Sequence, residues 1–145
     1  MLKPLHLRPV IDADLPIHFE YQSDREAAEI AGVPSRDWEA FTAHWTKILA
    51  DPQSIIRTIV YDGQVAGSVL SFDRAGVREV GYWIGRAFWG QGVATRALAE
   101  FLPLEPIRPL FAGISKANPA SVRVVQKCGF VPAGDDGPYL LFKLD

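Results

Sequence analysis

Apolar residues in the first fifty positions recur at the spacing of two helices. The first helix follows a short apolar segment, Leu5 to Val10, and the carboxylates of Asp12 and Asp14 are suited to cap it. The second helix is predicted to begin at Ser35 or Asp37 and to run to about residue 50. Its large apolar side chains fall on one helical face: Trp38, Phe41, Trp45, Ile48 and Leu49.

The pattern changes to that of strands after the second helix. Segments 54–61 and 64–72 are rich in β-branched and aromatic residues, and the Asp62-Gly63 pair between them is typical of a tight turn. These segments predict a hairpin. Val77 to Ile84 adds a third consecutive strand.

Helices and strands alternate in the rest of the chain. A helix is predicted from Val93 to Leu102 and a strand from Leu110 to Ile114. Asn118-Pro119 opens a further helix, which Gly129 ends.

The end of the chain indicates two short strands. They are Phe130-Val131 and Tyr139 to Leu144, separated by a turn at 134–138. The order is helices, then an antiparallel run of strands, then strands and helices in alternation. It predicts a mixed α/β fold in one domain over residues 1–145.

The segment from Glu79 to Leu102 reads as a strand, a glycine-bearing loop and a helix. Gly90 and Gly92 let the backbone approach a ligand and adopt positive φ. The first turn of a helix leaves N–H groups without partners, and the peptide dipoles add a partial positive charge. Each effect is worth up to ~1–2 kcal/mol for a bound phosphate. The loop therefore predicts a phosphate site made by the main chain.

Two common phosphate-binding motifs do not fit this loop. A nucleotide-triphosphate loop needs Gly, four residues and then Gly-Lys-Ser/Thr, and the sequence contains no such string. A dinucleotide fold needs a third glycine, where this chain has Thr95, and it needs a parallel unit.

The composition is that of an ordinary soluble globular domain, with 48% hydrophobic and 22% charged residues among 145. A formal net charge of -2 argues against general nucleic-acid binding, which rests on clustered Lys and Arg. The single cysteine, Cys128, excludes an intrachain disulfide and a cysteine-cluster metal site. No apolar run approaches about 18 residues and the start lacks the order of a signal peptide, so we expect a cytoplasmic protein without a membrane partner.

Two motifs about thirty residues apart carry a family resemblance. The first is Trp89-Gly-Gln-Gly-Val-Ala94 after the fourth strand, and the second runs from Asn118 through Ser121 and Lys127 to Gly129-Phe130. They resemble the Arg/Gln-x-x-Gly-x-Gly/Ala loop and the Asn-x-x-Ser…Lys-x-Gly-Phe segment of the GNAT superfamily of N-acetyltransferases. The likeness is strongest to the branch with the ribosomal-protein alanine acetyltransferases, and it covers roughly residues 5 to 144.

This resemblance implies a mostly antiparallel sheet of about six to seven strands, with the fourth and fifth strands splayed and about four flanking helices. It implies acetyl-CoA as co-substrate and no metal. The pyrophosphate would bind the backbone of Gln91 to Thr95, because Trp89 replaces the usual Arg or Gln. The implied cofactor-binding residues are Trp83, Ile84, Trp89, Gly90, Gln91, Gly92, Val93, Ala94, Thr95, Asn118, Ser121 and Lys127.

Individual roles follow from the same resemblance. The main-chain groups of Trp83 and Ile84 would bond the pantetheine arm as a strand does. Asn118 would bind a pantetheine amide, with a helix N-cap as the alternative role. Arg86, Arg96 and Lys127 are cations that could reach the remaining phosphate, or could be solvated surface.

Acetyl transfer to an amine requires a proton to leave the amine and the thiolate to be stabilised. Ser121 matches the family position whose hydroxyl reaches the sulfur and is the candidate acid, with Tyr139 as a rival donor. Glu79 is the candidate base, with a paired surface carboxylate as the alternative. The Glu79→Gln variant would then lose rate mainly at low pH. Cys128 fits a packed thiol better than an acetyl carrier, so we expect direct attack in a ternary complex.

The acceptor is left open among small amines, polyamine or drug-like amines and protein amino termini. An aromatic stripe, Trp38, Phe41, His44 and Trp45, could line its pocket or belong to the core. The sequence predicts an acetyl-CoA-dependent N-acetyltransferase, and the alternative is a silent CoA- or acyl-CoA-binding sensor. A homodimer is left open, and no nucleic-acid partner is expected.

Overall fold

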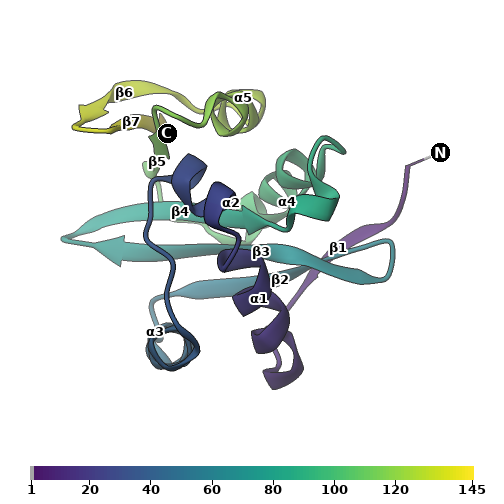
Figure 1. Ribbon diagram of the computed structural model, residues 1–145. Coiled ribbons are helices and arrows are strands. Elements are labelled where there is room, and N and C mark those ends of the chain that lie inside the picture. Colours follow the sequence, from purple (N-terminus) through teal and green to yellow (C-terminus); the bar gives the residue numbers. More distant parts are fainter. Residues whose placement is uncertain (1) are drawn as a thin grey trace.

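A seven-stranded sheet organises the computed structural model, which describes residues 2–145. Its order is β1-β2-β3-β4-β5-β7-β6, and neighbours are antiparallel except for β4 and β5. The strands are β1 (Leu5–Arg8), β2 (Ile55–Tyr61), β3 (Gln64–Arg74), β4 (Val77–Ile84), β5 (Leu110–Ser115), β6 (Val131–Asp136) and β7 (Tyr139–Leu144). The predicted mixed α/β class and mostly antiparallel sheet are confirmed (Figure 1).

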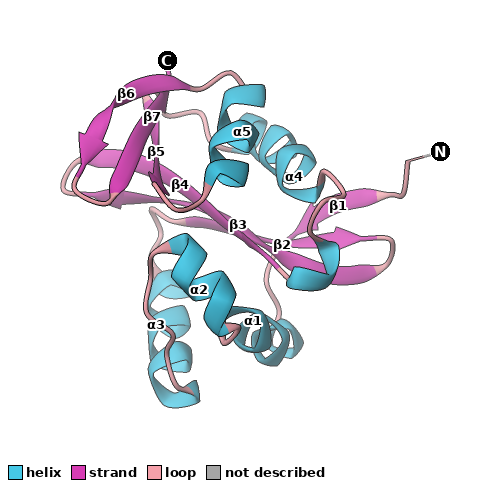
Figure 2. Ribbon diagram, turned by 45° about the horizontal axis from the view of Figure 1, so that its top comes forward, coloured by secondary structure: helices cyan, strands magenta, loops and turns pink. Residues whose placement is uncertain are grey.

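Helices cover both faces of the sheet (Figure 2). They are α1 (Leu15–Gln22), α2 (Arg25–Ala31), α3 (Trp38–Ala50), α4 (Val93–Phe101) and α5 (Pro119–Lys127). On one face, α4 and α5 bury Phe101, Leu98 and Val125 in the main core. On the other face, Phe41 and Trp45 of α3 pack on the sheet.

The β2–β3 hairpin confirms the turn predicted at Asp62-Gly63. Both residues adopt positive φ, 52° and 77°, which matches the twist of a two-residue hairpin loop. The last turn differs from its prediction, because β6 continues to Asp136 and pairs with β7 as far as Tyr139. The two strands therefore turn later than the glycine at 134 suggests.

The parallel pair β4–β5 is bridged at one position, Glu79 opposite Phe111. β4 continues from there to Ile84 beside β3, and β5 continues beside β7. The predicted splay of the fourth and fifth strands is thus present, and it opens toward the carboxyl end of β4.

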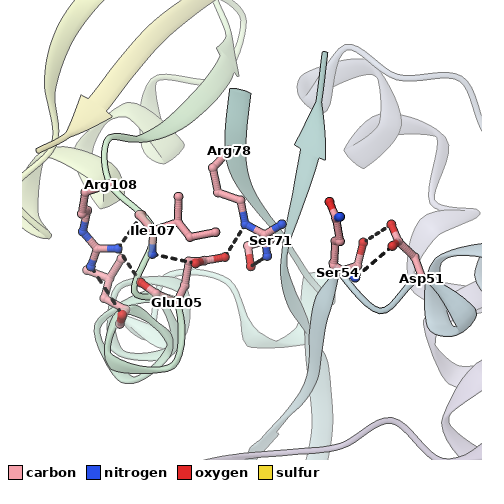
Figure 3. Close-up of polar contacts among 9 residues, drawn as sticks. Asp51, Ser54, Ser71, Arg78, Glu105, Ile107 and Arg108 are labelled. Atoms are coloured by element: carbon pink, nitrogen blue, oxygen red, sulfur yellow. Dashed lines mark hydrogen bonds and ion pairs between the residues drawn. The ribbon is translucent and has the colours of Figure 1, made fainter. Parts of the chain in front are cut away.

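A buried ion pair fastens the segment after α4 to the sheet (Figure 3). The Nε atom of Arg78 lies 2.5 Å from Oε1 of Glu105, whose side chain is 1% exposed. The second carboxylate oxygen accepts the main-chain N–H of Ile107 at 3.0 Å, and the Arg78 guanidinium also donates to Ser71 Oγ at 3.2 Å. Both carboxylate oxygens of Glu105 are therefore bonded, and the Arg78 guanidinium has two acceptors inside the protein.

Asp14 does not cap α1 with its side chain, but its carboxylate accepts the N–H of Ile11 at 3.0 Å, at the start of the 3-10 turn (Asp12–Asp14) that leads into α1. It is buried, and its two carboxylate oxygens accept hydrogen bonds from the Arg8 guanidinium at 2.7 and 2.9 Å. The Thr58 hydroxyl also donates to Asp14, at 2.8 Å. The carboxylate therefore ties the start of the chain to β2, a contact 44 residues apart that helix-capping preferences do not report.

His18 extends this network into the core. Its Nε2 lies 3.2 Å from Thr58 Oγ1, and its ring stacks on Trp45 with centroids 4.9 Å apart. Because Thr58 gives its hydrogen to Asp14, Nε2 of His18 is the donor in this contact. Burial lowers the pKa of His18 to about 4.

We expect the free energy of unfolding to fall by about 2–3 kcal/mol as pH drops from 7 to 4. The unfolded imidazole takes a proton below about 6.5, whereas the native one does so only near pH 4, so stability is lost on acidification. Denaturant unfolding of the His18→Gln variant across this range should show a much shallower pH dependence. The exposed His6→Gln variant should keep the wild-type slope, and equal slopes in all three proteins would contradict this assignment.

Candidate functional site

A cavity of about 470 Å³ lies beside the part of β4 that continues beyond its bridge to β5. Its walls come from the end of β4, the loop after it, the start of α4, one face of α5 and α2. The lining residues are Ala27, Ile30, Ala31, Tyr82, Trp83, Ile84, Phe88, Trp89, Gly90, Gly92, Val93, Ala94, Thr95, Asn118, Ala120, Ser121, Arg123, Val124 and Lys127. The two sequence motifs, about thirty residues apart, therefore meet in one cavity, and of the predicted cofactor residues Gln91 alone is not in its lining.

The glycine loop forms part of the cavity wall through Gly90 and Gly92. Gly90 and Gly92 adopt φ of 73° and 76°, the left-handed conformation that glycine allows at little cost. The helix α4 begins directly after, at Val93. The N–H groups of its first turn have no carbonyl four residues earlier to bond, so they are available to a ligand.

Trp89 braces this loop. Its indole Nε1 donates to the carbonyl of Ile84 at 2.9 Å, and the Arg86 guanidinium lies 5.0 Å from its ring centroid. Arg86 is itself paired with Asp24 and Glu26 around the start of α2. This position therefore fixes the loop through the indole, where the wider family has Arg or Gln.

The prediction for the main-chain groups of β4 needs correction at Trp83. The N–H of Gly85 donates to Ala66 of β3, and the groups of alternate residues face the same edge of a strand, so Trp83 faces β3 as well. Tyr82 and Ile84 face the gap instead, and the Ile84 carbonyl already accepts the Trp89 indole. Trp83 contributes its side chain to the cavity, with Nε1 donating to the carbonyl of Tyr21.

The predicted cations divide into two groups. Lys127 lines the cavity, whereas Arg86 is held by two carboxylates and Arg96 donates to the carbonyl of Lys3. Arg123 also lines the cavity, although it was not predicted from the sequence. It lies four residues before Lys127, so helical spacing from Lys127 would have found it.

Asn118 and Ser121 stand at the start of α5. The Asn118 side-chain oxygen accepts the N–H of Ser121 at 3.2 Å, so the N-cap role is present. Asn118 also lines the cavity, and its amide NH₂ remains available to donate. Capping and ligand binding are thus compatible at this residue.

Tyr82 is a site residue that the sequence reasoning did not select. Its hydroxyl makes a short contact with Ser121 Oγ, and burial raises the pKa of the phenol to about 12. Both residues line the cavity. The contact joins β4 to α5 across the gap. Tyr82 could have been found from the sequence, because it lies two residues before Ile84, and alternate residues of a strand face the same edge.

Two predicted catalytic residues lie outside this lining. Glu79 is at the bridge between β4 and β5, and its half-buried carboxylate lies 3.4 Å from the exposed Arg74, so it is paired as the alternative expected, but it is not at the surface. The Tyr139 hydroxyl donates to the carbonyl of Gly32 at 2.5 Å, at the end of α2. Their catalytic roles stay predictions without a contact to the cavity.

The aromatic residues of α3 do not line this cavity, and Phe41 and Trp45 pack instead in the apolar cluster between α3 and the sheet. Phe41 and Trp45 are buried, and Trp38 stacks on Phe41 from an exposed position. His44 is half-buried on the same helix. Of the two roles that the sequence left open for this stripe, Phe41 and Trp45 therefore have the core role.

Cys128 packs against α4, and its thiol donates to the carbonyl of Thr95 at 3.6 Å. Burial raises its pKa, which disfavours a reactive thiolate. Within residues 2–145 no three His, Cys, Asp or Glu side chains gather as a metal site would need. None of the described helices is long and apolar enough to cross a membrane.

The chain belongs to the GNAT acetyltransferase family, since the family model described as "Acetyltransferase (GNAT) domain" matches residues 4–131. A curated relative is the "Putative ribosomal N-acetyltransferase YdaF" of Bacillus subtilis (strain 168), 30% identical over 111 residues. The match covers 70% of this chain, which spans 61% of the length of that relative.

Solved structures share the fold at low sequence identity. The aminoglycoside acetyltransferase AAC(6')-Ib in complex with coenzyme A has a TM-score of 0.79 at 17% identity, over 95% of this chain and 94% of that one. The spermidine N-acetyltransferase of Vibrio cholerae, in complex with CoA and spermine, has a TM-score of 0.78 at 16% identity, over 96% and 92%. These likenesses establish the GNAT fold of the chain.

Proposed function

We propose that this protein transfers the acetyl group of acetyl-CoA to a primary amine by direct attack in a ternary complex, with residues 1–145 acting as one domain. The observation that carries the proposal is the cavity between the carboxyl end of β4 and α5. Its lining includes both the start of α4, with its main-chain N–H donors, and the Tyr82–Ser121 hydroxyl pair. The CoA complexes of the two structural relatives support this choice of donor.

Different residues are proposed to bind different parts of acetyl-CoA. Backbone N–H groups from Gln91 to Thr95 would hold the pyrophosphate, because they are oriented before the ligand arrives and the helix dipole favours its charge. The N–H of Ile84 and the Asn118 amide would bind the pantetheine arm. The Ser121 hydroxyl, which lines the same cavity, would meet the thioester sulfur.

Lys127 gives the first test of donor binding. The Lys127→Ala variant should raise the Kd of acetyl-CoA about fivefold at low salt and less at 0.5 M salt, because an exposed cation is worth roughly 1 kcal/mol and is screened. Isothermal titration calorimetry measures both. Lys47→Ala, on the last turn of α3, is the matched control. An unchanged Kd for Lys127→Ala at low salt would remove this residue from the site.

The amine proton gives a second test. The titratable side chains of the cavity are Tyr82, Arg123 and Lys127, and Glu79 is held by Arg74 outside it. We expect the rate to rise with pH according to the pKa of the acceptor amine, which is ~10.4 for an alkylamine and ~8 for an α-amino group. The pH–rate profile of Glu79→Gln should therefore parallel that of the wild type. A loss confined to low pH in that variant would make Glu79 the base after all.

The alternative function is a CoA- or acyl-CoA-binding sensor without turnover. CoA release measured over a panel of amines and peptides, beside calorimetry for acetyl-CoA, separates the two functions. The proposal expects release with at least one class of acceptor. Tight binding without release on any acceptor would favour the sensor.

A further inference from the structure

Among residues 2–145, the Tyr82 hydroxyl has one neighbour that can accept its hydrogen, and that neighbour is Ser121. It contacts Ser121 Oγ at short range and lies 3.4 Å from the Ser121 carbonyl oxygen. The ring packs against the main core beside α5, so the hydroxyl is held in place. The phenol stays protonated at every pH near neutrality, because burial raises its pKa to about 12.

The direction of this hydrogen bond decides what Ser121 can do. Either hydroxyl can donate in the short Oγ contact, and the Ser121 carbonyl at 3.4 Å is a longer and weaker alternative acceptor for Tyr82. Because a phenol is more acidic than an aliphatic alcohol, we assign the Tyr82 hydroxyl as the donor to Ser121 Oγ. Ser121 Oγ then acts as acceptor, and its own hydrogen is directed elsewhere. In the described residues 2–145, Ser121 Oγ has no other hydrogen-bond partner, and the side chain lines the cavity.

We propose that Tyr82 is a positioning residue, which holds the Ser121 hydroxyl so that its hydrogen points into the cavity, at the thioester sulfur. This inference rests on the proposed function and adds to it a residue of β4 that acts only through Ser121. A donor fixed before the reaction stabilises charge that develops later without reorganising. A serine free to rotate would spend much of its time bonded back to its own helix.

The step balances without any further reactant. The amine lone pair attacks the thioester carbon and forms the C–N bond, and the C–S bond then breaks with its electron pair going to sulfur. The amine nitrogen loses a proton to water, and the thiolate takes one from water. Ser121 donates a hydrogen bond to the developing thiolate, and both Ser121 and Tyr82 keep their protons.

The test compares acetyl-CoA with its selenoester analogue, because a selenolate is a weaker base and leaves with less need of a hydrogen bond. With the best amine of the panel, Tyr82→Phe should lower kcat about tenfold for the thioester. It should lower kcat less than about threefold for the selenoester and leave the KM of both donors unchanged. Ser121→Ala should likewise lose more kcat with the thioester than with the selenoester. The double variant Tyr82→Phe/Ser121→Ala should have a kcat no lower than that of Ser121→Ala alone.

Tyr61→Phe is the matched control, since Tyr61 is a buried tyrosine of β2 outside the cavity. It should behave as the wild type with both donors. Equal losses on both donors in Tyr82→Phe, or losses that multiply with those of Ser121→Ala, would overturn the positioning role. Absence of turnover in the wild type would instead overturn the proposed function, so the two failures are distinguishable.

Discussion

Replacing Gly92 by aspartate is expected to weaken acetyl-CoA binding at least about a hundredfold. The new carboxylate would stand at the start of α4, where the pyrophosphate is proposed to bind, and the two negative charges would repel each other in a partly enclosed cavity. It would also compete for the N–H groups of the first turn. Calorimetry with acetyl-CoA measures the change directly.

The chain provides a matched control for this variant. Gly63 has φ of 77°, against 76° for Gly92, and a Cβ at either position meets nothing within 4 Å. Gly63→Asp therefore introduces the same side chain with the same backbone strain, of roughly 1–2 kcal/mol, at the β2–β3 turn. It should bind acetyl-CoA like the wild type. Equal affinities of Gly92→Asp and Gly63→Asp would mean that the glycine loop does not hold the phosphates.

The second large effect concerns stability. Glu105→Leu should lower the free energy of unfolding by about 3–5 kcal/mol, because it leaves the Arg78 guanidinium buried without its carboxylate. The Ile107 N–H would lose its acceptor as well. Denaturant unfolding monitored by tryptophan fluorescence measures the loss.

The double variant Arg78→Met/Glu105→Leu separates charge from packing. With both charges replaced by apolar side chains of similar size, most of the lost stability should return. A surface comparison is Glu26→Ala, which removes an exposed partner of Arg86 and should cost less than about 1 kcal/mol. A double variant as unstable as Glu105→Leu alone would show that shape, and not the unpaired charge, dominates at this position.

Features that depend on nearby residues could be predicted from the sequence. The hairpin at Asp62-Gly63 and the glycine loop both follow from positive φ, which a single residue type reports. The helix α2 was missed because its buried positions are the small residues Ala27 and Ala28, which give a weak hydrophobic pattern. Its end is marked by Gly32 in the left-handed conformation, a signal that the sequence did carry.

Features that depend on distant residues could not be predicted in the same way. Asp14 looks like a helix cap, and its two long-range partners, Arg8 and Thr58, are fixed by the pairing of β1 with β2. The contact between Tyr82 and Ser121 joins residues 39 positions apart and depends on how α5 lies across the gap. The motifs therefore predicted which residues line the cavity better than which side chains act together in it.

A structure with acetyl-CoA bound tests the central claim most directly. We expect the pyrophosphate on the N–H groups from Gln91 to Thr95, the pantetheine arm between β4 and β5, and the sulfur within hydrogen-bond distance of Ser121 Oγ. A donor bound elsewhere, or a thioester turned away from Ser121, would contradict the account of this cavity as the site of acetyl transfer.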